Sequence, residues 1–496
     1  MKNIKMQIQG LLLILMISLP LELIAQKNKK SKKPNVIYIL TDQWRSSALG
    51  YTGNPDVKTP HLDQFSKEAV NLSNAVSVSP VCTPHRASLM TGRYPTTTGM
   101  FLNDLYLPSE ELCMAEIFKA DGYNTGYLGK WHLDGHGRLN NVEPERRQGF
   151  DYWKALECSH DYANMPYYDN DDPKIKYWDD FSPFSIAEDA NNYITEHSEN
   201  ENPFLLFVSI ATPHFPHDNA PDEFNNLYPE SELTLPPNLS EEWKSRARKE
   251  LRGYYAQCTA SDRAIGSILD KVKELNLWDD TIIVFTADHG EMMGAHGVRP
   301  WAKQRAWDES IKVPFLISYP AISKNKGATI NAPINTPDIL PSLLGLANLE
   351  IPATIEGDDI SKLIKSPNPE SDRAALVMNV CPFDLEHEYE EYRAIRTKQY
   401  TYARSPEKAT LLFDNIADPY QQNNLIDNAD FEILKIELDT KLKKELEQIG
   451  EENFKNRDYY LDKWNLKISN RNHAIDYFGF DEGKGIVQTP KFGILD

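Results

Sequence analysis

The stretch Val36-Ile37-Tyr38-Ile39-Leu40, followed by Thr41-Asp42-Gln43, indicates the fold class of this chain. A short run of apolar and aromatic residues suits a strand that is buried on both faces of a sheet. Three similar runs occur at 124–128, 204–210 and 281–286, and helical stretches such as 261–274 lie between the runs. This alternation predicts an α/β fold with a large, mostly parallel sheet sandwiched by helices.

Reactive polar residues follow each of these four runs. In chain order they are Asp42 and Gln43, Lys130 and His132, His214, and Asp288 and His289. Because the carboxyl ends of parallel strands meet at one edge of a sheet, we expect these side chains to gather there. Two carboxylates and an imidazole suit a hard divalent cation, calcium above all, with magnesium or manganese less favoured. Taken singly, each segment is better explained as an ordinary turn, and only the four together favour a site.

Charge and cysteine content exclude several classes of protein. The 496 residues, enough for two or three domains, include 53 Lys and Arg against 73 Asp and Glu, a net charge of −20. Nucleic acid is therefore not an expected partner, and an anionic substrate needs local cations or a metal. The cysteines are too few and too scattered for a disulfide scaffold, and their odd number leaves one unpaired. They are Cys82, Cys113, Cys158, Cys258 and Cys381.

The first residues have the pattern of a secretory signal peptide. A basic start precedes an apolar run at 11–21, and a small-residue ending allows cleavage before Gln26. The alternative is a membrane anchor, but the run is short and is interrupted by Pro20 and Glu22. We therefore expect a signal peptide at 1–25, a basic linker at 26–33, and a periplasmic or secreted protein without a membrane anchor.

A second boundary follows the main α/β region. Residues 366–371 form a Pro- and Ser-containing breaker cluster, which divides a catalytic domain at 34–365 from a C-terminal subdomain at 374–496. Stretches at 393–402 and 410–413 suggest an antiparallel sheet, and 431–450 suggests a charged amphipathic helix. The subdomain is therefore expected to be a smaller α+β unit, while its last part has no assignable fold.

The stretch from Cys82 to Arg93 carries the clearest chemical signal. Pro84 near its start and Gly92 at its end frame one short helix. The helix N-terminus would lower the pKa of Cys82 and attract oxyanions, and Arg86 would add donors for a tetrahedral oxyanion. The alternative is a buried cysteine in front of a capped helix.

These residues resemble the signature of the type I sulfatases, members of the alkaline-phosphatase-like superfamily, in which Cys-x-Pro-x-Arg is followed by Thr-Gly-Arg. The resemblance extends over nearly the whole mature chain. It includes the segments at 35–42, 59–63, 129–132, 159–161, 213–216, 287–291, 301–303 and 412–419.

The resemblance implies a site and a mechanism. It implies that a maturation enzyme oxidises Cys82 to formylglycine, and that calcium is bound by Asp42, Asp288, His289 and the modified Cys82. It also implies that Arg86, Lys130, His132, His214 and Lys303 surround the sulfate, with Ser159 as a further substrate contact. In our hypothesis a hydroxyl of the hydrated aldehyde attacks sulfur. His214, or alternatively Lys303, protonates the leaving alcohol, and His132 then takes a proton from the second hydroxyl.

Three positions depart from the common family pattern. Gln43 stands where many members have a second aspartate, and His289 stands where many have asparagine. Both substitutions also occur in choline-sulfatase-like and phosphonate-monoester-hydrolase-like relatives, so metal ligation by Gln43 and the preferred ester stay open. His85 replaces the usual small residue before the motif arginine and is expected to narrow the substrate pocket.

The resemblance and the expected export favour a secreted sulfatase acting on a sulfated carbohydrate or polysaccharide fragment. Tyr and Trp residues at 161–178 could stack on sugar rings or belong to the core. Two alternatives remain: a phosphonate monoester or phosphodiester hydrolase, and a non-catalytic glycan-binding relative with unmodified Cys82. The sequence does not specify the sugar, the sulfate position, endo or exo action, or the oligomeric state.

Overall fold

The computed structural model describes residues 33–319, 322, 325–366, 371–382, 391–451 and 454–466. The expected signal peptide, most of the linker and the last 30 residues, 467–496, lie outside the described residues, as does most of the breaker cluster. The described residues from Asn35 onward belong to one compact unit. None of the described helices is both long enough and apolar enough to span a bilayer.

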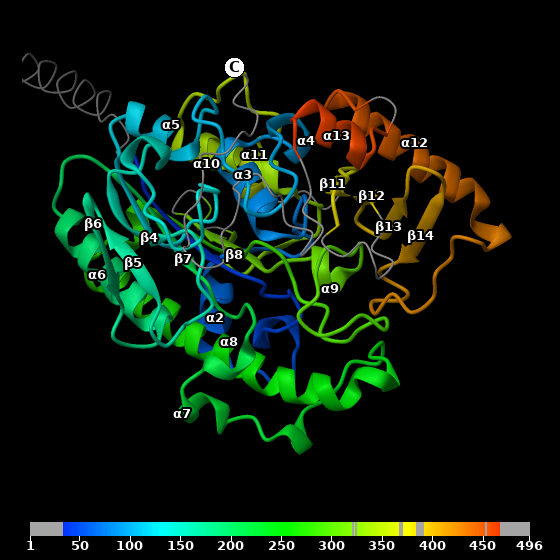
Figure 1. The fold of residues 1–496 in the computed structure, drawn as a ribbon, viewed down its shortest axis with the longest axis horizontal. Coiled ribbons are helices and arrows are strands. Elements are labelled where there is room, and N and C mark those ends of the chain that lie inside the picture. Colours follow the sequence, from blue (N-terminus) through cyan, green and yellow to red (C-terminus); the bar gives the residue numbers. More distant parts are fainter. Residues whose placement is uncertain are drawn as a thin grey trace, which may run out of the picture. The chain divides into compact units, whose positions relative to one another are not determined.

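A ten-stranded mixed sheet forms the centre of this unit (Figure 1). Its five central strands are parallel, while β9 at one side and β5 and β6 at the other run antiparallel to their neighbours. The large, mostly parallel sheet that the sequence predicted is therefore confirmed. In spatial order the strands are β10 (Thr329–Ile330), β2 (Val70–Leu72), β9 (Phe315–Ser318), β8 (Thr281–Ala287), β1 (Asn35–Thr41), β7 (Phe204–Ile210), β3 (Asn124–Lys130), β4 (Tyr152–Leu156), β5 (Pro166–Asp169) and β6 (Asp172–Tyr177).

The register of the central strands brings their carboxyl ends level with one another. Thr41 at the end of β1 pairs with Ile210 of β7 and Ala287 of β8, and Gly129 of β3 pairs with Ser209 of β7. Every residue of β1, β7 and β8 is buried, because both faces of the sheet are covered. The polar residues that follow these strands therefore start from one edge.

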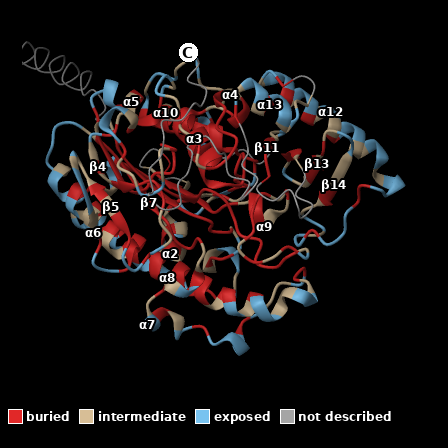
Figure 2. Cartoon of the chain, in the orientation of Figure 1, coloured by how far each residue is buried: buried red, intermediate tan, exposed pale blue. Residues whose placement is uncertain are grey.

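Helices cover both faces of the sheet (Figures 1 and 2). In one group α8 packs against α2, α6 and α7, and in the other α3 packs against α4, α5 and α10. The predicted helix at 261–274 is the C-terminal half of the longer α8. The helices are α2 (Pro60–Glu68), α3 (Cys82–Thr91), α4 (Pro95–Thr98), α5 (Met114–Ala120), α6 (Ser182–His197), α7 (Asp222–Asn225), α8 (Lys244–Glu274), α9 (Asp308–Ile311), α10 (Ile339–Ala347) and α11 (Ser361–Lys365).

A four-stranded antiparallel sheet follows in the C-terminal part, as expected. It comprises β11 (Ala375–Asn379), β12 (Tyr392–Arg396), β13 (Tyr400–Arg404) and β14 (Ala409–Asp414). The helix α12 (Glu432–Gln448) packs on it, and α13 (Arg457–Lys463) follows. The single strand predicted at 393–402 is wrong, because the chain reverses between Thr397 and Tyr400. That turn contains neither Gly nor Pro, so no residue typical of a turn marks its position.

The small sheet packs against the segments that lead into the site. Ala375 and Val377 of β11 share a hydrophobic cluster with Val76, Ala306 and Ile311. The backbone N–H of Met378 donates to the carbonyl of Val78 at 2.7 Å, only a few residues before α3. The C-terminal sheet therefore holds the chain on either side of the site in place.

Candidate active site

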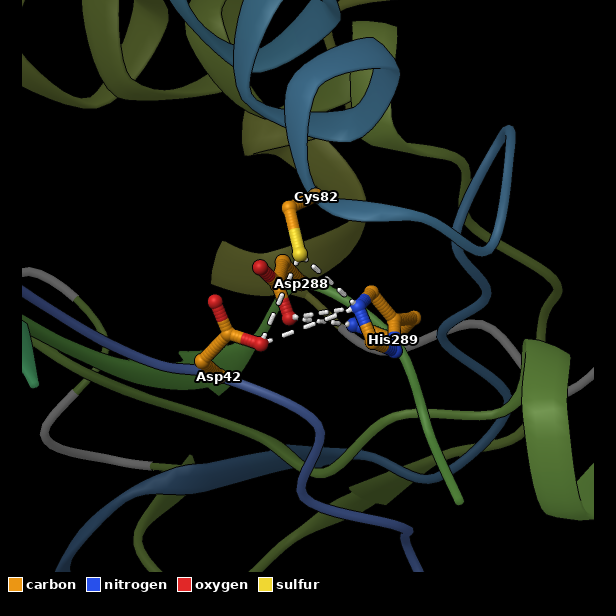
Figure 3. A group of neighbouring side chains, drawn as sticks. All are labelled: Asp42, Cys82, Asp288 and His289. Atoms are coloured by element: carbon orange, nitrogen blue, oxygen red, sulfur yellow. Dashed lines mark hydrogen bonds and ion pairs between the residues drawn. The ribbon is translucent and has the colours of Figure 1, made fainter. Parts of the chain in front are cut away.

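Cys82 is the first residue of α3, at the N-terminal end predicted from Pro84 and Gly92. All ten residues of the helix are buried, and Gly92 ends it in the left-handed conformation with φ of 66°. The Cys82 side chain points from the helix end toward the ends of β1 and β8 (Figure 3). The thiol is thus held where unpaired backbone N–H groups favour negative charge.

Four side chains converge in front of α3 (Figure 3). The Cys82 sulfur lies 3.6 Å from Oδ1 of Asp42 and 3.4 Å from Nε2 of His289. Together with Asp288, these residues offer one ligand atom each, all within 4.8 Å of one another. The strand-end argument placed Asp42, Asp288 and His289 at one edge of the sheet, and the structure brings them together there with Cys82.

Arg86 neutralises the far side of both carboxylates. Its NH2 group donates to Oδ2 of Asp42 at 3.1 Å and to Oδ2 of Asp288 at 3.2 Å, while Oδ1 of each belongs to the four-residue cluster. Its NH1 group donates to Oγ of Ser209 at 2.8 Å. Burial and the charge of Asp42 raise the pKa of Asp288 to about 6. Burial and Cys82 would also raise the pKa of Asp42. Lys130 and other nearby cations outweigh them and hold this pKa well below the usual value.

Two ammonium groups flank the Cys82 sulfur. Nζ of Lys130 and Nζ of Lys303 each lie 3.7 Å from it, and Lys130 also donates to Oδ2 of Asp42 at 2.7 Å. Burial would raise the pKa of the thiol, but Lys130 and Lys303 hold it well below its ordinary value. The surroundings of Cys82 therefore stabilise negative charge, as an oxyanion site requires.

Lys303 connects to His214, which it holds in the neutral form. Nζ of Lys303 donates to Nε2 of His214 at 3.0 Å, and Nδ1 of His214 donates to the carbonyl of Phe215 at 2.6 Å. Burial and the charge of Lys303 lower the pKa of His214 well below its ordinary value. The ring of His160 stacks on His214, with centroids 4.8 Å apart.

His132 is oriented by a loop carboxylate. Its Nε2 lies 2.9 Å from Oδ1 of Asp104, which also accepts from Nε of Arg138 at 2.9 Å. Burial alone would lower the pKa of His132, but Cys158 and Asp104 raise it to about 9. Asp104 thus makes His132 a stronger base and fixes its ring.

The amide of Gln43 links Lys303 to Glu291. Its Nε2 group donates to the Glu291 carboxylate and, at 3.2 Å, to the carbonyl of Trp301. Both of these partners only accept hydrogen bonds, so the amide oxygen must face Lys303, whose Nζ donates to it at 3.0 Å. Gln43 therefore positions Lys303 in this arrangement.

A cavity of about 190 Å³ opens in front of Cys82, and we call it the active-site pocket. Among the predicted residues, those that line it are Cys82, Lys130, His132, His214 and Lys303. Ser159 lies between two lining residues, Cys158 and His160, and its hydroxyl accepts from the N–H of Asp161 at 3.2 Å. His85 lies outside the lining, where its Nδ1 is 2.9 Å from Oγ of Ser77.

Several residues of the site carry no sequence signal that we recognised. They are Asp104, Arg138, Cys158 and Arg299, whereas His160 and Trp301 belong to segments of the resemblance but were given no role. Asp104 and Trp301 have φ of 61° and 64°, and Gln43 and His132 have 62° and 61°. Non-glycine residues rarely adopt this left-handed conformation, which costs roughly 1–3 kcal/mol each. Strained backbone thus occurs at several positions in and beside the pocket, where tertiary contacts hold it.

This fold, with an oxygen-rich cluster and two lysines around a cysteine at a helix N-terminus, is the arrangement expected of a hydrolase of anionic esters. The family model described as Sulfatase matches residues 34–349, and that of the N-sulphoglucosamine sulphohydrolase C-terminal region matches residues 294–450. The chain belongs to the sulfatase family and is a sulfate ester hydrolase.

Similar proteins span nearly the same length. An ulvan-active sulfatase of Formosa agariphila is 63% identical over 94% of this chain and 91% of its own. An endo-4-O-sulfatase of Bacteroides thetaiotaomicron is 30% identical over 81% of this chain and 89% of its own. A solved structure of a protein from a glycosaminoglycan-metabolism locus of Bacteroides thetaiotaomicron is 28% identical. It has a TM-score of 0.76 and covers 86% of this chain and 98% of that one.

Proposed function

We propose that this protein removes sulfate groups from ulvan or its fragments. The observation that carries this proposal is the 63% identity to an ulvan-active sulfatase, which extends over 94% of the chain. Because the match covers 94% of the chain, it extends well beyond the catalytic motif, and loops are where substrate preference is generally determined. A sulfated polysaccharide lies outside the cytosol, which agrees with the signal peptide expected at 1–25 and with a periplasmic or secreted location.

In this proposal a maturation enzyme converts Cys82 to formylglycine before the enzyme acts. A thiol that attacked sulfur would form a bond without an easy exit, whereas a hydrated aldehyde can release sulfate and return to the aldehyde. The position of Cys82 at a helix N-terminus between Lys130 and Lys303 supports a role as nucleophile. A low thiol pKa also assists oxidation.

The residues present fit a calcium ion. Asp42 and Asp288 each direct Oδ1 toward the cluster, and Nδ1 of His289 lies 3.0 Å from the carbonyl of Gly290. Donation to that carbonyl leaves the lone pair of Nε2 facing the cluster, as metal ligation requires. Two carboxylates favour calcium over softer ions, with magnesium or manganese as weaker candidates. When bound, the ion polarises a sulfate oxygen and the nucleophilic hydroxyl.

The remaining residues act on charge and protons. Arg86, Lys130 and Lys303 stabilise the negative charge of the sulfate group during transfer. The proton for the leaving alcohol comes from the Lys303–His214 pair, in which the resting proton lies on Lys303 and His214 accepts. His132, whose ring Asp104 orients, is the candidate base and accepts the proton of the second hydroxyl in its neutral form when sulfate leaves. Ser159 and His85 remain candidates for shaping the substrate pocket.

We also propose that the catalytic domain comprises residues 34–365 and the C-terminal subdomain 374–496. The subdomain supports the pocket from behind. Nδ2 of Asn379, at the end of β11, donates to the carbonyl of Gln304 at 3.1 Å, and Gln304 lines the pocket next to Lys303. The C-terminal sheet thus contributes to activity without supplying a catalytic group.

Sulfate release from ulvan fragments tests the proposal. We expect the protein, produced together with a formylglycine-generating enzyme, to release sulfate from ulvan oligosaccharides and from nitrophenyl sulfate, with little turnover of an aryl phosphonate. A mass spectrum of the peptide containing residue 82 should show that this residue has lost one sulfur and two hydrogen atoms and has gained one oxygen atom. Unmodified Cys82 in an active preparation would refute the nucleophile, and preference for the phosphonate would favour the alternative ester hydrolase.

A further inference from the structure

A second cavity of about 460 Å³ lies next to the active-site pocket. The two share a wall, because Phe215 and Trp301 line both. The rest of the second cavity is formed by the segment from Pro216 to Asp218, by α7, by Glu230 and by the N-terminal half of α8. It is more than twice as large as the pocket in which the sulfate group is expected to bind.

Trp301 in the shared wall is held by the active site itself. Its carbonyl accepts from Nε2 of Gln43 at 3.2 Å, and its backbone has φ of 64°. The guanidinium of Arg246 lies 5.0 Å from the centre of its ring. Trp301 therefore lies at the boundary between the two cavities, with its carbonyl bonded to Gln43 and its ring beside Arg246. Flat aromatic side chains pack well against the C–H faces of sugar rings.

The charged groups of the second cavity are mixed in sign. Its cationic lining residues are Arg246, Lys249 and Arg252, and its acidic lining residues include Asp218, Asp222 and Glu230. Because acidic residues balance the cations, the lining has no positive excess that would hold a compact polyanion. Sugar hydroxyls both donate and accept hydrogen bonds, and they are satisfied by this combination of donors and acceptors.

One side of this cavity is rigid. Nδ1 of His217 lies 2.8 Å from Oε2 of Glu250, and the other oxygen of Glu250 lies 2.6 Å from NH2 of Arg246. Gly253 allows α8 to approach this segment, since a Cβ there would lie 1.9 Å from the carbonyl oxygen of His217. Lys249 is exposed and forms no ion pair within the described part of the chain, so its charge is available to a ligand.

We propose that the second cavity binds a neighbouring sugar unit of the same polysaccharide chain whose sulfated unit occupies the active-site pocket. This inference rests on the proposed function. The glycan would pass Trp301 and Phe215 on its way from one cavity to the other. Its hydroxyls would bond to the acidic residues of the second cavity, and its acidic substituents would face Arg246 and Lys249. The enzyme then recognises at least two linked sugars, so wild-type kcat/KM should increase when the substrate is extended from a sulfated monosaccharide to an oligosaccharide.

The test compares two substrates in one variant. For Arg246→Ala combined with Lys249→Ala, we measure the ratio of kcat/KM on ulvan oligosaccharides to kcat/KM on nitrophenyl sulfate, which is too small to occupy both cavities. We expect this ratio to fall about tenfold or more, mainly through KM, because charge-assisted hydrogen bonds to the second sugar are lost. Arg263→Ala is the matched control, since Arg263 is exposed on the same helix and lines neither cavity.

The outcomes separate this inference from the proposed function. An unchanged ratio in the double variant, or equal wild-type kcat/KM on monosaccharide and oligosaccharide, would overturn the second sugar site. An equal fall in the Arg263→Ala control would also overturn it, because the effect would not belong to the cavity. Absence of wild-type turnover on nitrophenyl sulfate and on ulvan oligosaccharides alike would instead contradict the proposed function.

Discussion

The active-site pocket and the second cavity share a wall but hold their charges differently. At and behind the pocket, the side chains of Lys130, Asp42 and Arg86 are at most 1% exposed, and each is paired within the protein. In the second cavity the Arg246 side chain is 48% exposed. Buried charges must be compensated by fixed partners, whereas exposed charges are solvated and can rearrange.

This difference assigns separate tasks to the two regions. A fixed arrangement of charges stabilises one particular transition state, since no reorganisation is needed when the reaction occurs. An exposed and mixed arrangement suits recognition of a hydrated polymer. Removal of groups from the pocket should therefore abolish chemistry or folding, and removal of groups from the second cavity should change substrate preference with little loss of stability.

The largest expected effect comes from Cys82. We expect Cys82→Ala to lower kcat by roughly 10⁴-fold or more on both nitrophenyl sulfate and ulvan oligosaccharides, as removal of a covalent nucleophile generally does. The control is Cys258→Ala, which also removes a buried thiol but lies within α8. Activity in Cys82→Ala close to the wild-type value would contradict the nucleophile and remove the chemical distinction between the two regions.

Chelation should affect the pocket alone. We expect removal of the divalent ion to lower kcat by about 10²–10³-fold, because loss of Lewis-acid stabilisation costs several kcal/mol. Calcium should restore activity better than zinc, since Asp42 and Asp288 offer hard oxygen ligands. Metal analysis and thermal unfolding follow the same samples. Full activity in the metal-free protein would show that the cluster has no catalytic role. A higher unfolding temperature in the metal-free protein would show that the cluster does not bind a cation.

A comparison of two arginines tests the difference in burial directly. Arg86→Ala leaves the buried carboxylates of Asp42 and Asp288 without their counter-charge, which should lower the free energy of unfolding by about 3–5 kcal/mol. Arg246→Ala removes a half-exposed partner of Glu250, and about 0–1 kcal/mol is expected. Urea unfolding of both variants gives the two values. Equal losses would show that burial does not distinguish the two regions.

Sequence alone predicted the parts of the site that follow directly from strands. Asp42, Lys130 and Asp288 come at or just after the ends of β1, β3 and β8, whose apolar runs identify them as strands buried on both faces. Once the strands pair in register, the backbone places these residues at one edge without any further information. Cys82 was predicted equally well, because Pro84 and Gly92 mark the ends of its helix.

The parts supplied by loops could not be predicted in this way. Asp104 and Trp301 adopt left-handed backbone conformations that only their tertiary contacts hold in place, and neither is a glycine that would signal such a turn. The N-terminal half of α8 was missed because its charged first turns obscure the apolar face of the helix. The second cavity depends on that half and on Gly253, so no local pattern revealed it.

In our proposal the proton for the leaving alcohol comes from the boundary of the two regions, where His214 bonds to Lys303 and precedes Phe215 in the shared wall. We expect His214→Ala to lower kcat on ulvan oligosaccharides by about 10²-fold, within the range for loss of a general acid or base. The loss on nitrophenyl sulfate should be much smaller, because nitrophenolate leaves without protonation. Lys303→Ala distinguishes the two candidates. If Lys303 delivers the proton without His214, only Lys303→Ala will show the difference between substrates. An equal loss on both substrates in His214→Ala would mean that His214 positions Lys303 and transfers no proton itself.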